Sequence, residues 1–510
     1  MADQLRPVTV VAPGFFGLNT QDSSVTLPKE YALKAENAVI DQFGRIASRR
    51  GWVKVNSSSG FNSTEPSLIK EVIKTDGTKE ILSIGDNKIY SGTTSLTLKY
   101  TGSTWTAQNW KAVDFNGFTY FFQRNHAPLI YVHSTNTISL MSAYGSYSGS
   151  VPQANEVLSA FGRLWVADTS TDKRTVTWSD SLQGFAWTGG SSGSVNIEKV
   201  LTNGTDTITA LAAFNGYLII FCRRSIIIYN GAQNDPTTNL SLVEVIDGVG
   251  CISRDTVQDV GTDIFFLSDS GVKSLARVIQ EKSNPIFDIS RNVKNDLITD
   301  IATNGNDDNI KSVYSDADGF YLLSLPSRKI IYCFDVKSRL QDGSCKVTTW
   351  TIAPISFCAT SDRKLYFSRT GYIAQYSGAS DNGAAYTFSY YTSNIDAQSP
   401  GIFKILKKMT MLLIGGNNTT INIRWATDYS NSYKSSQYTL PTIARAEYNI
   451  AQYNIDEYNI GYNTGLSVRK IERQISGTGG VFQIGIEANI ATETISVQQL
   501  DVFVKTGRVI

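Results

Sequence analysis

The stretch ALAAFNGYLIIFCRRSIIIYNG, residues 210–231, contains the pattern on which the expected fold rests. An apolar run meets Asn215-Gly216, a second apolar run follows, and a third run ends in Tyr229 and a small turn. Asn-Gly readily supplies the positive φ angles that a type I′ hairpin needs. The stretch therefore predicts three short antiparallel strands joined by tight turns.

The same pattern recurs through the middle of the chain. The hairpin glycines follow one another at intervals of 45, 54, 45 and 58 residues, at Gly117, Gly162, Gly216, Gly261 and Gly319. A weaker unit occupies residues 80–92, and a final unit occupies residues 362–378. Units of about 40–50 residues made of short strands are typical of β-propeller blades. We count six or seven units and predict an all-β fold with a propeller of about six blades over residues 61–380. A sandwich built from serial hairpins is the alternative.

The two flanks of this region have a different pattern. Residues 1–60 contain few clean hairpins and predict an extended N-terminal arm. Within the arm, PKEYALKAENAVID (residues 28–41) predicts a helix, because proline is favoured at a helix start. Residues 381–510 alternate or run apolar, as at 408–414, 420–425 and 481–488, with glycine-rich turns between them. They predict a separate C-terminal β-sandwich-like domain.

Composition limits the classes of function. The chain has 510 residues, of which 41% are hydrophobic and 18% charged, so we expect folded domains rather than disorder. The net charge of +1 disfavours tight binding of nucleic acid by the protein as a whole, since such affinity comes from neutralised phosphates. No apolar run approaches the length of about 20 residues that a spanning helix needs, so we expect no membrane anchor.

The N-terminus also lacks the apolar core of a signal peptide. The five cysteines are odd in number and have no C-x-x-C spacing, as expected for reduced core cysteines of a protein made in a cytosol.

Sequence motifs for catalysis are weak throughout. The only histidines are His126 and His133, whereas histidine is the most common general base and metal ligand. The G-x-S-x-G match at residues 189–193 lies in a Gly/Ser-rich loop rather than between a strand and a helix. The calcium-loop-like start at residues 316–319 lacks the later carboxylates, and the glycines at 477–480 precede a strand rather than a helix. We therefore predict no catalytic residue, no cofactor and no metal site, and expect that the protein is not an enzyme.

Two groups of residues are candidates for contact with a partner. The basic cluster Arg45, Arg49 and Arg50 is one of several, beside Arg223-Arg224 and Lys404, Lys407 and Lys408, and each is also consistent with a solvated face or a set of ion pairs. The second group is a repeat with a period of five residues, which matches neither helix nor strand, at Tyr448, Tyr453 and Tyr458. Exposed tyrosines suit a partner surface, and a tyrosine ladder on a sheet edge is the alternative.

Several stretches resemble one family. APGFFGLNTQDSSVTLPKEYALKAENAVIDQFGRIASRRGWVKV (residues 12–55) resembles the opening of tail proteins of short-tailed phages, with Gly17-Leu18-Asn19, the stretch from Pro28 to Asn37, and Gly44-Arg45 to Arg50-Gly51. Residues 160–168 with 176–179, 210–231, and 248–251 with 257–275 resemble blades of the same family. Residues 477–490 and 495–508 resemble its closing strands. The family is the podovirus tail nozzle or hub, also called tail tubular protein B or packaged-DNA stabilisation protein.

The resemblance implies a structural role. Family members form a ring of six copies, a homohexamer below the portal and the head-to-tail adaptor, which retains packaged DNA and encloses the conduit for genome ejection. The implied partners are further copies of the chain, the adaptor, a tail fibre or tip protein, and genomic DNA in transient, non-specific contact. The implied location is the virion tail, after synthesis in the host bacterial cytoplasm. This chain is shorter than the larger members, so contacts made by their inserted domains are not carried over.

Two other functions fit the residues. The first is a glycan- or protein-binding propeller, such as a receptor-binding phage protein, which the tyrosine repeat would suit. The second is a sialidase-like glycosidase, because the turn at residues 179–187 is similar to the structural Ser/Asp–Gly–Trp turn of that class.

Overall fold

A computed structural model describes the chain except for residues 1–4, 58–60, 63, 104, 106–108, 202–204, 284–287, 398–400, 443–467 and 510. The chain forms two compact units. The propeller unit comprises Lys54–Ile331 and Ile352–Gln375. The sandwich unit comprises Met1–Val53, Tyr332–Thr351 and Tyr376–Ile510. The sequence-based boundaries at residues 60 and 380 therefore differ from this division, because both ends of the chain contribute to one unit.

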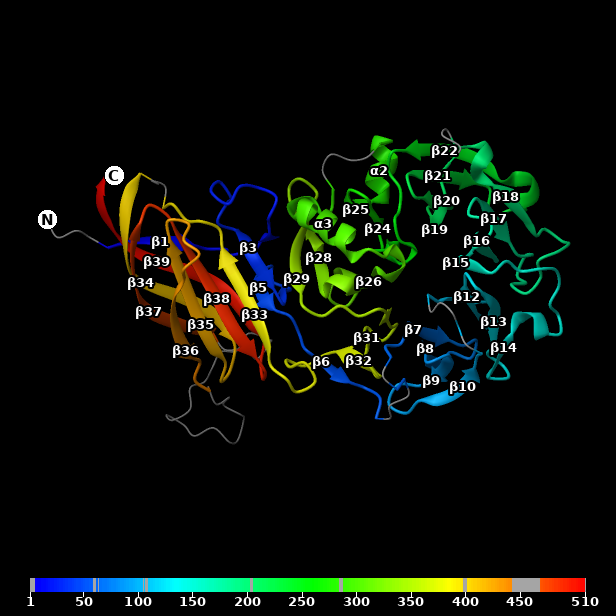
Figure 1. The fold of residues 1–510 in the computed structure, drawn as a ribbon, viewed down its shortest axis with the longest axis horizontal. Helices are drawn as coiled ribbons and strands as arrows, with labels where there is room; N and C mark the ends of the chain where they lie inside the picture. Colours follow the sequence, from blue (N-terminus) through cyan, green and yellow to red (C-terminus); the bar gives the residue numbers. More distant parts are fainter. Residues whose placement is uncertain are drawn as a thin grey trace. The chain divides into compact units, whose positions relative to one another are not determined.

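The first four blades of the propeller unit are four-stranded antiparallel sheets (Figure 1). The first contains β7 (Leu68–Ile73), β8 (Lys79–Gly85), β9 (Lys88–Ser91) and β10 (Thr97–Thr101). The second contains β11 (Lys111–Phe115), β12 (Phe118–Gln123), β13 (His126–Val132) and β14 (Thr137–Leu140). The third contains β15 (Ala154–Ala160), β16 (Arg163–Thr169), β17 (Thr175–Trp178) and β18 (Gly193–Asn196). The fourth contains β19 (Ile208–Phe214), β20 (Tyr217–Cys222), β21 (Ser225–Asn230) and β22 (Ser241–Asp247), with α1 (Pro236–Asn239) before β22.

The remaining three blades are less regular. The fifth contains β23 (Gln258–Asp259), β24 (Ile264–Ser268) and β25 (Gly271–Ser274), followed by α2 (Leu275–Glu281) and α3 (Lys294–Asn304). The sixth contains β26 (Lys311–Ser315), β27 (Phe320–Leu325) and β28 (Ile330–Arg339), a strand that starts in this unit and ends in the other. The seventh contains β30 (Phe357–Ala359), β31 (Leu365–Arg369), β32 (Tyr372–Tyr376) and β6 (Trp52–Lys54), and the last two strands each cross the boundary between the units.

The seven blades form a closed ring (Figure 1). The innermost strands β7, β11, β15 and β19 contact one another in succession. The short 3-10 helix η3 (Arg254–Thr256) continues the series from β19 to β26, which contacts β30, and β30 contacts β7. Next to β6, the Val55 amide donates to the carbonyl of Ile373 at 3.0 Å, so early and late segments of the unit share the last blade. The all-β propeller prediction is confirmed. Seven blades stand where about six were predicted, because the weak unit at residues 80–92 forms part of a complete first blade among the residues described.

The hairpin turns have the geometry that the sequence predicts. Asn215 and Gly216 have φ angles of 49° and 83° and join Phe214 to its cross-strand partner Tyr217. Both turn positions therefore lie in the left-handed region, as a type I′ turn requires.

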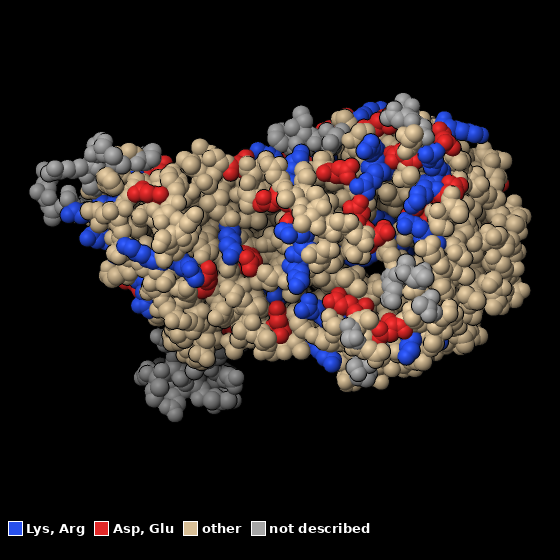
Figure 2. Space-filling view, in the orientation of Figure 1, with Lys and Arg blue, Asp and Glu red and all other residues tan. Residues whose placement is uncertain are grey.

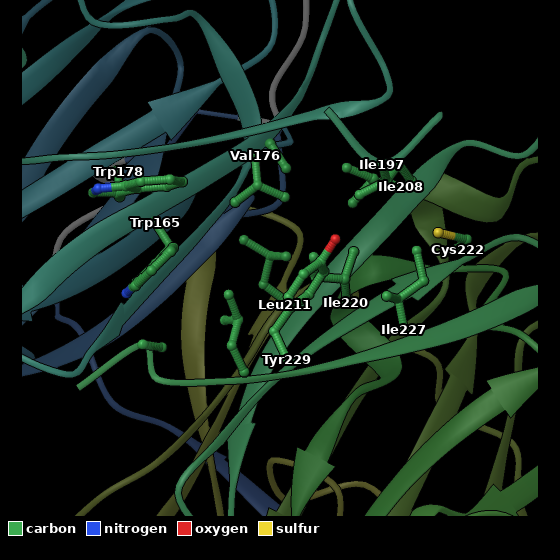
Figure 3. Close-up of a cluster of buried hydrophobic side chains, with 13 residues drawn as sticks. Trp165, Val176, Trp178, Ile197, Ile208, Leu211, Ile220, Cys222, Ile227 and Tyr229 are labelled. Atoms are coloured by element: carbon green, nitrogen blue, oxygen red, sulfur yellow. The ribbon is translucent and has the colours of Figure 1, made fainter. Parts of the chain in front are cut away.

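Blade-to-blade packing explains why the strands are almost continuously apolar. Side chains alternate between the two faces of a strand, and in a propeller both faces are covered by neighbouring blades. Leu218, Ile220 and Cys222 of β20 pack toward the third blade with Trp165 and Trp178, as Figure 3 shows for this layer. Their neighbours Ile219 and Phe221 pack on the other side, toward the fifth blade.

The sandwich unit contains two sheets. The first has the order β37-β34-β39-β5-β4, with β1 also paired to β39: β37 (Val468–Gly479), β34 (Ile402–Gly415), β39 (Ile495–Val509), β5 (Ile46–Ser48), β4 (Ala38–Ile40) and β1 (Arg6–Val10). Within this unit the second has the order β29-β2-β3-β33-β38-β35-β36: β29 (Cys345–Trp350), β2 (Gly17–Leu18), β3 (Tyr31–Glu36), β33 (Tyr386–Thr392), β38 (Phe482–Ile490), β35 (Thr420–Thr427) and β36 (Lys434–Thr439). The strands predicted near residues 408–414, 420–425 and 481–488 are confirmed.

Two expectations for the N-terminal residues differ from the structure. The predicted helix over residues 28–41 is wrong: β3 and β4 occupy this stretch, separated by Asn37 at φ 52°. Residues 6–48 do not form a free arm, since their strands lie within both sheets of the sandwich unit. The reason is tertiary: backbone pairing of β3 with β33 buries Ala32 and Ala35, and such pairing overrides a weak helical propensity.

Candidate functional site

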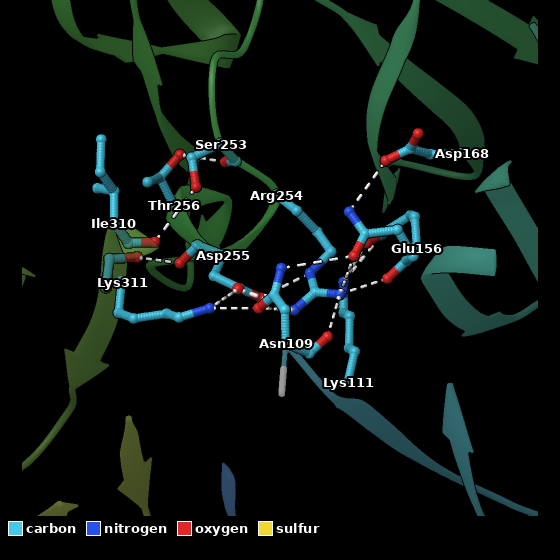
Figure 4. Close-up of polar contacts among 12 residues, drawn as sticks. Asn109, Lys111, Glu156, Asp168, Ser253, Arg254, Asp255, Thr256, Ile310 and Lys311 are labelled. Carbon is cyan, nitrogen blue, oxygen red and sulfur yellow. Dashed lines mark hydrogen bonds and ion pairs between the residues drawn. The ribbon is translucent and has the colours of Figure 1, made fainter. Parts of the chain in front are cut away.

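A network of charged and amide side chains links the inner strands of the propeller (Figure 4). Lys111 of β11 donates from Nζ to both carboxylate oxygens of Glu156 at 2.8 Å. Glu156 of β15 is fully buried, and its Oε1 also accepts the backbone N–H of Leu211 in β19 at 3.0 Å. One carboxylate thus connects the second, third and fourth blades.

Arg254 of η3 extends this network across the ring (Figure 4). Its Nε and one Nη donate to the two oxygens of Asp255 at 2.9 Å each. The same guanidinium donates to Asn109 Oδ1 at 2.9 Å and to Asn155 Oδ1 at 3.1 Å. Lys311 of β26 donates to Asp255 and to Asn109, so the network reaches the sixth blade.

The pKa values of the network's titrating groups shift in opposite directions. Burial raises the pKa of Glu156, and the charges of Lys111 and Arg254 oppose this without cancelling it. Burial also acts to raise the pKa of Asp255, but the charges of Arg254 and Lys311 outweigh it and the pKa is lowered. Burial lowers the pKa of Lys311. Because both oxygens of Glu156 are already engaged and its side chain is inaccessible, the network connects blades rather than offering a carboxylate to a ligand.

A charged depression of about 340 Å³ adjoins the network. Asp168 lies in its wall and accepts hydrogen bonds from Arg124, from Lys173 at 3.0 Å and from Asn155 at 2.9 Å. Asp168 has φ 59°, a left-handed conformation that Asp tolerates better than most residues. Arg223 and Asp307, which also line the depression, form an ion pair.

The lining of the depression is polar and of mixed charge. It comprises Arg124, Asn155, Asp168, Lys173, Thr207, Ile208, Thr209, Arg223, Ile252, Arg254, Gly305, Asn306, Asp307 and Asp308. Figure 2 shows Lys and Arg gathered over part of one face of this unit, with Asp and Glu among them. Such a surface suits a charged or hydrogen-bonding partner more than an apolar one.

Neither a metal-ligand cluster nor a membrane-spanning helix is found in the part of the chain that is described. Over these residues, no group of three or more His, Cys, Asp or Glu side chains is arranged to hold a metal ion. No helix there is long and apolar enough to cross a membrane.

Arg49, a predicted partner contact, lies inside the sandwich unit. Its side chain is inaccessible, and its guanidinium makes a bidentate pair with Asp381, with both distances 2.8 Å. It also donates to Asn37 Oδ1 at 3.0 Å and stacks on the ring of Tyr386 with a distance of 4.0 Å to the centroid. These contacts give Arg49 a structural role in this conformation.

The structure does not bring the other predicted contact residues to one surface. Arg45 is nearly buried and pairs with Asp41 at 2.8 Å. Arg50 is exposed, and its backbone N–H donates to the hydroxyl of Tyr376 at 2.9 Å. Tyr448, Tyr453 and Tyr458 lie outside the described residues. Their role as partner contacts stays a prediction.

The residues set aside in the sequence have local structural roles. His133 is buried and contacts Thr119 Oγ1 at 2.9 Å, and burial lowers its pKa. The calcium-loop-like residues 316–319 form the hairpin turn between β26 and β27, closed by Gly319 N–H to Ser315 O at 2.8 Å. All five cysteines are buried, at Cys222, Cys251, Cys333, Cys345 and Cys358.

No local sequence pattern identifies the network. Asn109, Glu156, Arg254 and Lys311 are separated by dozens of residues and belong to different blades. The only available signal was a polar residue at the start of an apolar strand, which a solvent-exposed position produces equally well.

Comparisons with known proteins add a fold likeness only. No protein-family model and no curated protein matches the chain. One similar solved structure is PorZ, a surface component of the type-IX secretion system of Porphyromonas gingivalis, with 12% identity and a TM-score of 0.36. Another is the extracellular domain of a putative hybrid two-component system, BT3049 of B. thetaiotaomicron, with 12% identity and a TM-score of 0.37.

The aligned parts cover 63% of this chain and 37% of PorZ, and 62% of this chain and 40% of the sensor protein. The chain thus spans less than half the length of either. A third structure, TmCBM61 in complex with β-1,4-galactotriose, has 12% identity and a TM-score of 0.15, covering 28% of this chain and 72% of that one. At these scores the functions of the three proteins do not bear on this chain.

Proposed function

We propose that the chain is a subunit of the tail nozzle or hub of a short-tailed phage, a structural protein rather than an enzyme. In this role six copies form a ring below the portal and adaptor, retain the packaged DNA and enclose the conduit through which it leaves. Its partners are further copies, the adaptor, a fibre or tip protein, and DNA in transient contact, and its location is the virion tail.

One observation carries the proposal. The stretches that resemble the nozzle family lie at the beginning, in the blades and at the end of the chain, and in the structure they fall on the strands that build both units. The N-terminal stretch, residues 12–55, supplies β2 to β6, and the C-terminal stretches supply β38 and β39. A resemblance confined to one blade would indicate only a propeller.

The decisive experiment removes the protein from the source phage. A nonsense mutation in its gene should give heads that package DNA and then lose it, measured as genome copies protected from nuclease over time. Complementation with the intact chain should restore protection. Stable, full heads without the protein would rule the proposal out, and so would cryo-EM of the tail that lacks sixfold propeller density below the adaptor.

A second candidate is a propeller that binds glycans or proteins. The observation in its favour is the polar depression beside the network, which hydroxyl, amide, carboxylate and guanidinium groups line. Glycan-array binding that is lost on Asp168→Ala, with the fold intact by circular dichroism, would favour this function. Absence of signal on the array and on host cells would leave it without support.

A further inference from the structure

The two faces of the propeller differ in the charge of their turns. Strands alternate in direction within a blade, so the turns joining second and third strands all emerge on one face. These turns contain seven basic residues (Arg124, Lys173, Arg174, Arg223, Arg224, Arg328 and Lys329) and three acidic ones (Asp86, Asp172 and Asp269). The turns joining first and second strands, on the opposite face, contain three basic residues (Lys74, Arg363 and Lys364) and five acidic ones (Asp76, Asp263, Asp316, Asp318 and Asp362).

We name the basic residues in these turns of the second, third and fourth blades the basic arc: Arg124, Lys173, Arg174, Arg223 and Arg224. Arg124, Lys173 and Arg223 line the charged depression of about 340 Å³. Arg223 and Arg224 line a second depression of about 330 Å³, together with hydroxyl residues such as Thr207 and with the carboxylates Asp206 and Asp247. The two depressions share Thr207 and Arg223, so they are adjacent.

Carboxylates hold the arc in place without covering it. Asp168 binds Arg124 and Lys173, Glu198 binds Arg174, and Asp307 binds Arg223. The side chains of Lys173 and Arg223 nevertheless remain 44% and 40% exposed. Next to them Asp206 accepts the backbone N–H of Arg224 at 2.9 Å and the hydroxyl of Ser225 at 2.7 Å.

The side chain of Arg224 is an exposed cation of the arc. It lines the second depression, where Asp206 and Asp247 are the nearby carboxylates. Planar guanidinium groups match phosphate geometry and bind it by paired hydrogen bonds. The nearby carboxylates reduce the net attraction, which makes any contact with a polyanion weak and sensitive to salt.

We propose that the basic arc is the surface of the propeller that contacts the phosphate backbone of duplex DNA. This proposal rests on the proposed function, in which the protein encloses DNA. It adds which face of the propeller, and which residues, contact that DNA. The contact is not specific for base sequence, because phosphate contacts position a duplex without identifying its bases. Weak contact suits DNA that must move past the surface.

The test measures binding of the intact protein to a fluorescein-labelled duplex of arbitrary sequence by anisotropy, between about 50 and 200 mM salt. Lys173→Gln with Arg224→Gln should weaken binding about tenfold at the lowest salt and reduce the slope of log affinity against log salt by about 2. The matched control is Arg363→Gln with Lys364→Gln, which removes the same charge from the opposite face. The control should bind like the unmodified protein.

Several outcomes overturn the assignment. If the control variant Arg363→Gln with Lys364→Gln weakens DNA binding equally, the binding depends only on the net charge of the protein and not on the basic arc. A complete lack of salt-dependent binding at about 50 mM salt removes the contact itself.

A separate measurement distinguishes this proposal from the proposed function. Particles that carry the Lys173→Gln, Arg224→Gln chain should retain their genome but release it at an altered rate, and an unchanged rate overturns the arc as a DNA contact while leaving the nozzle role intact. If particles without the protein retain their genome, the proposed function fails whatever the arc binds in solution.

Discussion

The guanidinium of Arg49 forms two hydrogen bonds of 2.8 Å with the carboxylate of Asp381, a residue 332 positions later in the chain. Both residues belong to the sandwich unit, and the pair joins its N-terminal and C-terminal segments. The Arg49 side chain is inaccessible and that of Asp381 is 17% exposed, so the ion pair is formed in a largely water-free environment.

The Arg49–Asp381 ion pair is the basis of a first prediction. Asp381→Asn leaves the buried guanidinium without a counter-charge, and breaking one side of a buried pair typically costs about 3–5 kcal/mol. We expect a large fall in the melting temperature of the sandwich unit, measured by calorimetry. The control is Glu36→Gln, which breaks a surface pair with Lys34 whose side chain is 46% exposed, and such a pair is worth about 0–1 kcal/mol. Equal effects of the two variants would contradict the structural role of Arg49.

Packing between blades gives a second prediction. Leu218 of β20 is fully buried, whereas its neighbour Tyr217 is 36% exposed. Leu218→Ala should destabilise the propeller unit by about 2–5 kcal/mol because it removes apolar contacts and leaves a cavity. Tyr217→Ala, one position away, should cost much less, about 1 kcal/mol or below. Urea unfolding of the two variants compares them directly, and a larger loss in Tyr217→Ala would contradict the orientation of β20.

Features that depend on neighbouring residues could be predicted from the sequence, whereas contacts between distant residues could not. The Asn215-Gly216 turn depends on two adjacent residues, and its positive φ angles follow from their chemistry. The partner of Arg49 depends on a residue more than 300 positions away, and no local pattern identifies it. The same limit applies to the network around Arg254, whose members come from separate blades. Local rules therefore predicted the hairpins and the propeller, but not β3, which forms because β33 pairs with it.

The hairpin turn gives a third prediction. Gly216 has φ 83°, and a Cβ at this position would meet only a side-chain atom of Gln233 at 4.0 Å. Gly216→Ala is therefore not opposed by a clash, and its cost comes from the left-handed backbone, about 1–2 kcal/mol. At Gly231, with the same φ, a Cβ would lie 2.1 Å from the carbonyl oxygen of Asn239. Gly231→Ala should therefore destabilise the protein more than Gly216→Ala in thermal unfolding, and the reverse order would contradict the turn geometry.

The last prediction concerns the dependence of stability on pH. The pKa of Asp255 is lowered in the folded protein, so the folded state favours its ionised form. Its contribution to stability is therefore complete above the ordinary value of 3.8 and is lost as the pH falls below it. Asp255→Asn should reduce the melting temperature strongly at neutral pH and progressively less in acid.

Glu156 should show the opposite dependence, because burial raises its pKa and the folded state favours its protonated form. Its ordinary value is 4.5, and the stability gained by protonation is complete below that value and is lost as the pH rises through the folded pKa. Relative to Glu156→Gln, the unmodified protein should therefore gain stability as the pH falls. Melting temperatures of the three proteins from neutral pH to acid test both signs together. Parallel curves for Asp255→Asn and Glu156→Gln would mean that the two carboxylates do not titrate as their environments require.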